Sequence, residues 1–194
     1  MNSNHDFASE IVVVTGLPRS GTSMMMQMLN AGGLPAFTDD RRKPDEDNPK
    51  GYFELEKVKD LRQDNSWIPQ ARGYAVKVIA QLLEYLPPEN YRYLFMLRDL
   101  DEIVHSQKAM LERSGKRGGQ LTGEQLKAVF KKQLLRAEKT IASSSAPILK
   151  INHRSCIDDP QSIAESINHF LDGRLNTSML SAVVAPELHR QKSY

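Results

Sequence analysis

Short apolar runs alternate along this chain with longer amphipathic segments. The apolar runs are too short for helices and are rich in β-branched or aromatic residues, so they predict buried strands at residues 11–15, 74–79, 93–97 and 147–151. Helical patterns lie between them. Strands that alternate with helices predict an α/β fold, a three-layer parallel sheet with helices on both faces.

Two of the helical segments carry clear signals at their ends. Residues 122–143 open with Thr122 and Gln125 at the spacing of a capping box, and their apolar residues recur at helical spacing on one face. This stripe consists of Leu126, Phe130, Leu134, Ala137 and Ile141. A later helix is predicted after Asp159, with Pro160 in the first helical position.

Three further helices are predicted with less distinct ends. Residues 23–31 form a methionine-rich segment that is closed by Gly32 and Gly33. Its methionines are expected to fill the irregular gap between helix and sheet, because an unbranched thioether adapts to such space; they are Met24, Met25, Met26 and Met28. The other two helices are expected at residues 54–65 and from about residue 101 onward.

Length and charge limit the possible functions. The 194 residues suit one domain, residues 1–194, and the net charge of +2 is too small for a nucleic-acid coat or a membrane-binding surface. Any affinity for anions must therefore be local. The lone Cys156 is expected to be a small buried thiol, and the apolar run at residues 11–14 is too short for a signal or a membrane span, so we expect a cytoplasmic protein.

A candidate phosphate-binding loop follows the first predicted strand, in IVVVTGLPRSGTSMMMQML. Gly16 and Gly21 have the spacing of the motif G-x-x-x-x-G-K-S/T, in which backbone N–H groups, here those of residues 19–22, face an anion at a helix N-terminus. Thr22 replaces the lysine of that motif, and a cation, Arg19, stands inside the loop instead. Ordinary ATP chemistry would thus lose one of its main cationic contacts.

The loop sequence Pro18-Arg19-Ser20-Gly21-Thr22-Ser23 resembles the 5′-phosphosulfate loop of sulfotransferases, P-K/R-S-G-T-S/T. This resemblance implies a P-loop fold, the cofactor 3′-phosphoadenosine 5′-phosphosulfate (PAPS), and no metal. It also implies that these six residues, together with Gly16, hold the 5′-phosphate. The Arg19 guanidinium would then assist the transfer of the sulfuryl group.

A second group of candidate ligands follows the third predicted strand. Arg98 stands at the strand end, where ligands bind in open α/β sheets, and Ser106 lies eight residues further on. In sulfotransferases an arginine and a serine at this spacing grip the 3′-phosphate of the adenosine. Two alternatives stay open: Arg98 and Asp99 could form a surface ion pair, or Asp99 could hold magnesium as in an NTPase.

Two further residues, Lys77 and Glu54, are candidates for a direct role in sulfuryl transfer. Lys77 interrupts an apolar strand. The resemblance implies that it corresponds to a lysine or histidine that assists the transferring sulfuryl group in sulfotransferases. The alternative is a lysine that extends from the strand edge to solvent. Glu54 is similar in place to the family's general base, or else it is an exposed glutamate at a helix start. His105 and His153 are the other candidate bases, and we expect His105 to face solvent.

The resemblance thins after about residue 110. The Gly-x-x-Gly-x-x-Lys element that closes over the 3′-phosphate in many relatives is absent; residues 115–119 are expected to form a flexible loop or an acceptor lid, and Arg190 or Lys192 could supply the missing cation. Three functions stay open: a sulfotransferase that acts on a hydroxyl or amine of a small-molecule or glycan acceptor, a nucleotide kinase or NTPase, and a nucleotide-binding protein without catalysis. The sequence carries no signal for the oligomeric state.

Overall fold

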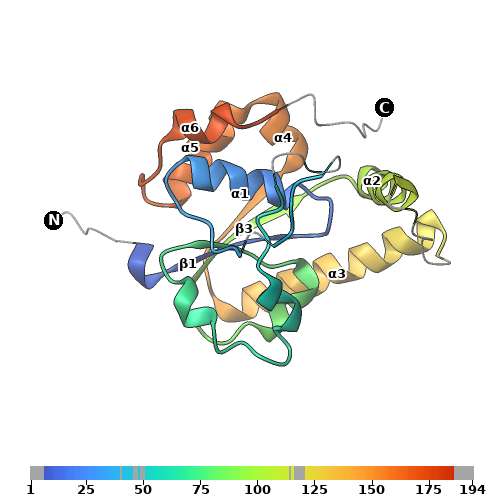
Figure 1. Ribbon diagram of the computed structural model, residues 1–194, viewed down its shortest axis with the longest axis horizontal. Helices are drawn as coiled ribbons and strands as arrows, with labels where there is room; N and C mark the ends of the chain where they lie inside the picture. The colour runs from blue at the N-terminus through green and yellow to red at the C-terminus, as the bar shows by residue number, and fades with distance from the viewer. Residues whose placement is uncertain are drawn as a thin grey trace.

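The computed structural model describes residues 7–39, 41–45, 48, 51–113, 115 and 121–185 of the chain (Figure 1). Its sheet has four parallel strands in the order β2-β1-β3-β4. They are β1 (Ile11–Gly16), β2 (Ala75–Lys77), β3 (Tyr91–Leu97) and β4 (Ile148–Asn152). The predicted parallel α/β sheet is therefore confirmed.

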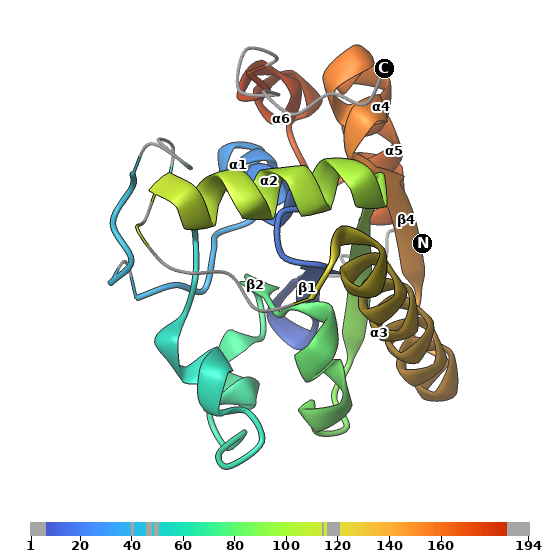
Figure 2. The same cartoon turned by 90° about the vertical axis from the view of Figure 1, so that its right-hand side faces the viewer.

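Helices cover both faces of this sheet, as Figure 1 shows. One face carries α1 (Thr22–Ala31), α4 (His153–Asp158), α5 (Pro160–Phe170) and α6 (Thr177–Ala182). The other face carries α3 (Gly123–Ser144) and the short 3-10 turns η2 (Glu56–Asp60), η3 (Ile68–Ala71) and η4 (Ala80–Tyr85). A further turn, η1 (Phe7–Ser9), precedes β1, and α2 (Leu100–Arg113) crosses beyond the carboxyl ends of the strands (Figure 2).

The central strand β1 separates two hydrophobic cores. Val12 and Val14 face the α1 side, whereas Ile11 and Val13 face the α3 side, and all four are fully buried. This alternation on a strand without any exposed residue is typical of a parallel sheet that is covered by helices on both faces. Three of the four methionines of α1 are fully buried in the first core as expected, whereas Met24 lines a cavity at the end of the sheet.

The helix-end signals in the sequence are confirmed. The Thr122 hydroxyl accepts from the Gln125 backbone N–H (3.3 Å), and the Gln125 side chain accepts in return from the Thr122 N–H (2.9 Å). At α5 the Asp159 carboxylate accepts from the Ser162 N–H at 3.0 Å. Each bond satisfies a donor that the first helical turn leaves without a partner.

The predicted helix at residues 54–65 is wrong. The chain is still extended at Leu55, and only the 3-10 turn η2 follows. The reason is that groups outside the segment engage its backbone: Thr38 donates to the Glu54 carbonyl (2.7 Å), and the Asp39 carboxylate accepts from the Glu56 N–H (2.9 Å). These contacts replace the hydrogen bonds of a first helical turn.

The two outer strands also differ from the prediction. Strand β2 has three residues rather than six, because the chain turns into η4 soon after Lys77. Strand β4 is an edge strand in which only Ile151 is buried, so its apolar residues are not enclosed as the pattern suggested. The segment containing Lys116 and the residues Arg190 and Lys192 lie outside the described residues.

The strand order places the ligand-binding edge. From β1 the chain moves outward to β2 on one side, and from β3 it moves outward to β4 on the other, so the direction of winding reverses between β1 and β3. Ligands of open α/β sheets bind in the crevice outside the carboxyl ends at such a switch point. Both the candidate phosphate loop and Arg98 follow directly from these two strands.

Candidate functional site

A cavity of about 460 Å³ lies at this carboxyl edge. The phosphate loop, α2, the start of α4 and the segments after Glu54 and Lys77 all contribute to its lining. Its basic lining residues are Arg19, Arg42, Lys59, Lys77, Arg98 and Arg113, and its acidic lining residue among the described part of the chain is Glu54. Such an excess of cations suits an anionic ligand.

The phosphate loop needs its glycines for two close approaches. A side chain at Gly16 would come within 2.6 Å of the Met96 carbonyl oxygen, and one at Gly21 within 2.5 Å of His153 Cδ2. Both glycines have positive φ, and so does Arg19 (71°), a conformation that costs an ordinary residue about 1–2 kcal/mol. The loop therefore holds Arg19 in a strained backbone geometry, a feature common at ligand sites.

The loop residues divide between the cavity and its back wall. Pro18, Gly21, Thr22 and Ser23 line the cavity, next to the N-terminus of α1. Ser20 is buried behind the loop instead, and its backbone N–H donates to the Leu17 carbonyl (3.1 Å). Contrary to the expectation from the sequence, this N–H is therefore not available to an anion. Gly16 likewise shapes the turn without lining the cavity.

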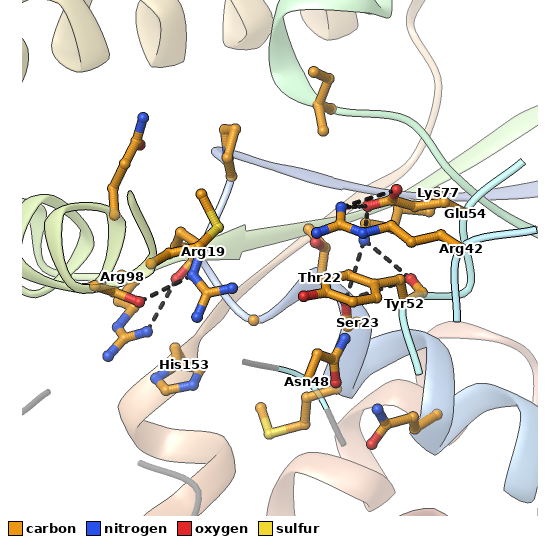
Figure 3. Close-up of a pocket in the computed structure, with 18 of the residues that line it drawn as sticks. Arg19, Thr22, Ser23, Arg42, Asn48, Tyr52, Glu54, Lys77, Arg98 and His153 are labelled. Carbon is orange, nitrogen blue, oxygen red and sulfur yellow. Dashed lines mark hydrogen bonds and ion pairs between the residues drawn. The ribbon is translucent and has the colours of Figure 1, made fainter. Parts of the chain in front are cut away.

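Arg98 and Ser106 both contact the phosphate loop through Arg19, and Figure 3 shows Arg98 beside Arg19. Arg98 donates through Nη1 to the Arg19 carbonyl (3.0 Å), and Arg19 donates through Nε to the Ser106 hydroxyl (3.0 Å). Glu102 pairs with Arg98 Nε at 2.8 Å and is itself buried. The interaction fixes the guanidinium of Arg98 at the mouth of the loop.

Asp99 has a local role in the structure. Its carboxylate accepts from the backbone N–H groups of Asp101 (2.9 Å) and Glu102 (3.1 Å), which caps the first turn of α2. Asp99 does not line the cavity. This geometry accounts for the acid after β3 as a helix cap.

Lys77 and Glu54 form the centre of the other half of the cavity (Figure 3). Lys77 Nζ donates to Glu54 Oε1 (3.0 Å), the Ser23 hydroxyl (3.1 Å) and the Tyr52 carbonyl (3.0 Å), which uses all three of its donors. Its side chain is only 7% exposed, so it does not extend to solvent. Burial lowers the pKa of Lys77, although the Glu54 carboxylate opposes the shift.

Arg42 also binds the carboxylate of Glu54. Its Nη1 lies 3.1 Å from both carboxylate oxygens of Glu54. Burial alone would raise the pKa of Glu54, but the charges and hydrogen bonds of Lys77 and Arg42 outweigh it, so the pKa lies below its usual value. Glu54 is therefore a bound, ionised carboxylate rather than an exposed glutamate at a helix start.

Tyr52 helps to position Arg42. The Arg42 guanidinium stacks 3.3 Å from the centre of the Tyr52 ring, and the Tyr52 hydroxyl donates to Asp45 at 2.7 Å. Burial and the Asp45 hydrogen bond raise the pKa of Tyr52 to about 12, so its hydroxyl remains a donor. These contacts link Arg42 and Asp45, which precede Glu54 in the chain, to the cavity.

His153, one of the candidate bases in the sequence, lines the cavity. It begins α4 directly after β4, is 7% exposed, and packs against Gly21 of the phosphate loop. The only sequence signal was its place after a predicted strand. His105, in contrast, faces solvent on α2, as expected.

No group of three or more His, Cys, Asp or Glu side chains is arranged to hold a metal ion within the described residues. No helix in the same part of the chain is long and apolar enough to cross a membrane.

Solved structures resemble this chain, whereas no protein-family model and no curated protein matches it. Sulfotransferase STF1 from Mycobacterium tuberculosis H37Rv aligns with a TM-score of 0.59 and 16% identity, over 94% of this chain and 75% of that one. The sulfotransferase domain from the curacin biosynthetic pathway gives 0.54 and 14%, over 95% and 78%.

A third similar structure is retinol dehydratase in complex with androsterone and the inactive cofactor PAP, with a TM-score of 0.51 and 13% identity over 93% of this chain and 64% of that one. Likeness at such low identity establishes the fold. The chain has the P-loop α/β fold of sulfotransferases, and the resemblance inferred from residues 18–23 is confirmed at this level.

Proposed function

We propose that this chain is a sulfotransferase that takes the sulfuryl group from PAPS and transfers it to an acceptor hydroxyl. The observation that carries the proposal is that the phosphate loop, the pair Arg98 and Ser106, and Lys77 line one cavity on a sulfotransferase fold. These three sets of residues lie far apart in the sequence, and a phosphosulfate nucleotide has an anionic group for each set.

Two clusters of side chains would bind the nucleotide. Thr22, Ser23 and the N-terminus of α1 suit the 5′-phosphosulfate, because a helix N-terminus and hydroxyl donors both favour an anion. Arg98 and Ser106, which are tied to the loop through Arg19, suit the 3′-phosphate. The related structure with PAP is consistent with a bisphosphate ligand in this fold.

Glu54 and Lys77 would serve the transfer itself. Glu54, which is ionised because two cations hold its pKa low, would accept the proton of the acceptor hydroxyl. Lys77 would neutralise charge on the sulfuryl oxygens. Since the three donors of Lys77 are already engaged, ligand binding requires that Lys77 exchange at least one of its present partners.

Melting temperatures measured with different nucleotides test this function. We expect PAP to stabilise the protein without magnesium, by roughly 2.7 kcal/mol at about a hundred times its dissociation constant. AMP, which lacks the 3′-phosphate, should stabilise less at the same concentration. Stabilisation by ATP that depends on magnesium, with no response to PAP, would contradict the proposal and favour a kinase or NTPase.

A serine variant locates the 3′-phosphate. Ser106→Ala removes one hydrogen bond, which should weaken PAP binding roughly threefold to tenfold and leave AMP binding unchanged. Ser143→Ala, on the exposed side of α3, is the matched control. Isothermal titration with both nucleotides separates the cases, since equal losses for PAP and AMP would place Ser106 elsewhere in the site.

A further inference from the structure

Apolar side chains from the segments that follow Glu54 and Lys77 line part of the cavity and form an apolar wall. This wall consists of Leu55, Val58, Ile79 and Leu82. Ile79 lies two residues after Lys77, where the chain is still extended, so the two side chains point to the same side. The other three residues pack from behind against the core on the α3 side of the sheet. The wall is therefore part of the folded core and has a defined shape.

The segments that build this wall offer almost no hydrogen bonds to a ligand. Of the residues they contribute to the cavity after Glu54 and Lys77, the one with a polar side chain is Lys59. Its ammonium pairs with Glu56 at 2.8 Å, and its side chain is 62% exposed, so it lies at the rim. Helix α2 contributes the apolar Met110 to the cavity, together with the polar Gln107 and Arg113, which are not part of the wall.

We infer that the acceptor is an apolar hydroxyl compound, a phenol or an alicyclic alcohol, and not a sugar. Each sugar hydroxyl placed against this wall would lose water without gaining a partner, which is costly, whereas an aromatic or alicyclic body gains from the same contact. The inference rests on the proposed function, in which the reacting hydroxyl lies at Glu54 and Lys77, the residues that the two wall segments follow in the chain.

The transfer is balanced with this acceptor. Glu54 takes the proton of the acceptor hydroxyl as the acceptor oxygen bonds to sulfur. The bond between sulfur and the 5′-phosphate oxygen of PAPS breaks, and its electron pair stays on that phosphate oxygen. The products are the sulfate ester and PAP, and the proton on Glu54 returns to water. No further reactant is needed.

Equilibrium binding of two probes tests the acceptor class without requiring turnover. The probes are 2-naphthol, which has an aromatic body with one hydroxyl, and methyl β-glucopyranoside, which has several hydroxyls. Both are titrated into the free protein and into the protein saturated with PAP, and binding is followed by calorimetry. We expect saturable binding of 2-naphthol and at least tenfold weaker binding of the glucoside.

A variant of the wall connects this binding to the proposed surface. Leu82→Asn should weaken 2-naphthol binding roughly tenfold, because it places a polar group without a partner against the ligand, and it should leave PAP binding unchanged. Leu135→Asn makes the same substitution at an exposed site on α3 and should change neither. Circular dichroism and the melting temperature check that both variants are folded.

The outcomes separate this inference from the proposed function. If PAP binds and 2-naphthol does not, or if the glucoside binds more tightly, the acceptor class is wrong and the sulfotransferase proposal stands. If Leu82→Asn binds 2-naphthol as the parent chain does, the wall is not the acceptor surface. If PAP fails to stabilise the protein, the proposed function itself fails.

Discussion

Arg42 and Lys77 hold the carboxylate of Glu54 between two positive charges, and only Lys77 is deeply buried. Replacing Arg42 with glutamine removes one of the two charges that lower the pKa of Glu54, so this pKa should rise toward the ordinary value. NMR titration of the protein with isotope-labelled glutamate, with the Glu54 signal identified from Glu54→Gln, measures the change.

Arg41→Gln is the matched control for Arg42. The Arg41 side chain is 73% exposed and forms an ion pair with Asp39, so its removal should leave the titration of Glu54 unaltered. With a working acceptor, the acid limb of the pH dependence of kcat/KM should move to higher pH in Arg42→Gln alone. A Glu54 titration that is the same in both variants would show that Arg42 does not control this carboxylate.

The sequence did not identify Arg42 or Tyr52 as site residues, for a physical reason. Arg42 belongs to a stretch of mixed charges with two prolines, and the sequence between residues 39 and 50 contains nothing that distinguishes one arginine from its neighbour. Only the fold brings Arg42 onto Glu54 and the ring of Tyr52. Lys77, in contrast, could be singled out because a charge within an apolar strand is unusual.

Among the elements, the phosphate loop depends on the contact between Gly21 and His153. Gly21→Ala should reduce the free energy of unfolding by more than the 1–2 kcal/mol of the left-handed conformation, since the new Cβ would lie 2.5 Å from His153. PAP binding should weaken at least tenfold as the loop shifts. Urea unfolding and calorimetric titration measure the two effects.

Gly33→Ala provides a control of similar backbone geometry. Gly33 has φ of 106° against 98° for Gly21, and its Cβ would meet nothing within 4 Å. It should therefore show the conformational cost alone and bind PAP normally. If the two alanine variants lost the same stability, the contact with His153 would not constrain the loop.

Elements were predictable wherever local signals agreed with their final surroundings. The capping box of α3, the Asp159 cap and the fully buried β1 all rest on interactions within a few residues or on a pattern that burial reproduces. The predicted helix at 54–65 failed because Thr38 and Asp39, which are distant in sequence, engage its backbone. Such tertiary contacts produce no periodic pattern in the sequence.

For the whole molecule, the ion pair of Glu54 contributes to stability in a defined pH range. Because the pKa of Glu54 is lower in the folded chain than its ordinary 4.5, the unfolded chain binds the proton more readily. The contribution is thus fully present above about pH 4.5 and is lost as the pH falls through the folded value. Glu54→Gln should be less stable than the parent chain at neutral pH, and the difference should shrink in acid.

Urea unfolding of both chains at several pH values tests this dependence. Glu165→Gln, an exposed glutamate on α5, serves as the control and should follow the parent chain throughout. A difference between Glu54→Gln and the parent that does not change with pH would mean that the ion pair does not stabilise the fold through its charge.

The cavity gathers positive charge inside a molecule that is nearly neutral. Six of the seven charged side chains that the described residues contribute to its lining are basic, yet the net charge of the chain is only +2. Since the Debye length is about 8 Å at physiological ionic strength, this field fades close to the entrance. An anionic nucleotide is thus not steered from a distance: added salt should change the lifetime of the complex more than the rate of encounter, which stopped-flow kinetics can distinguish.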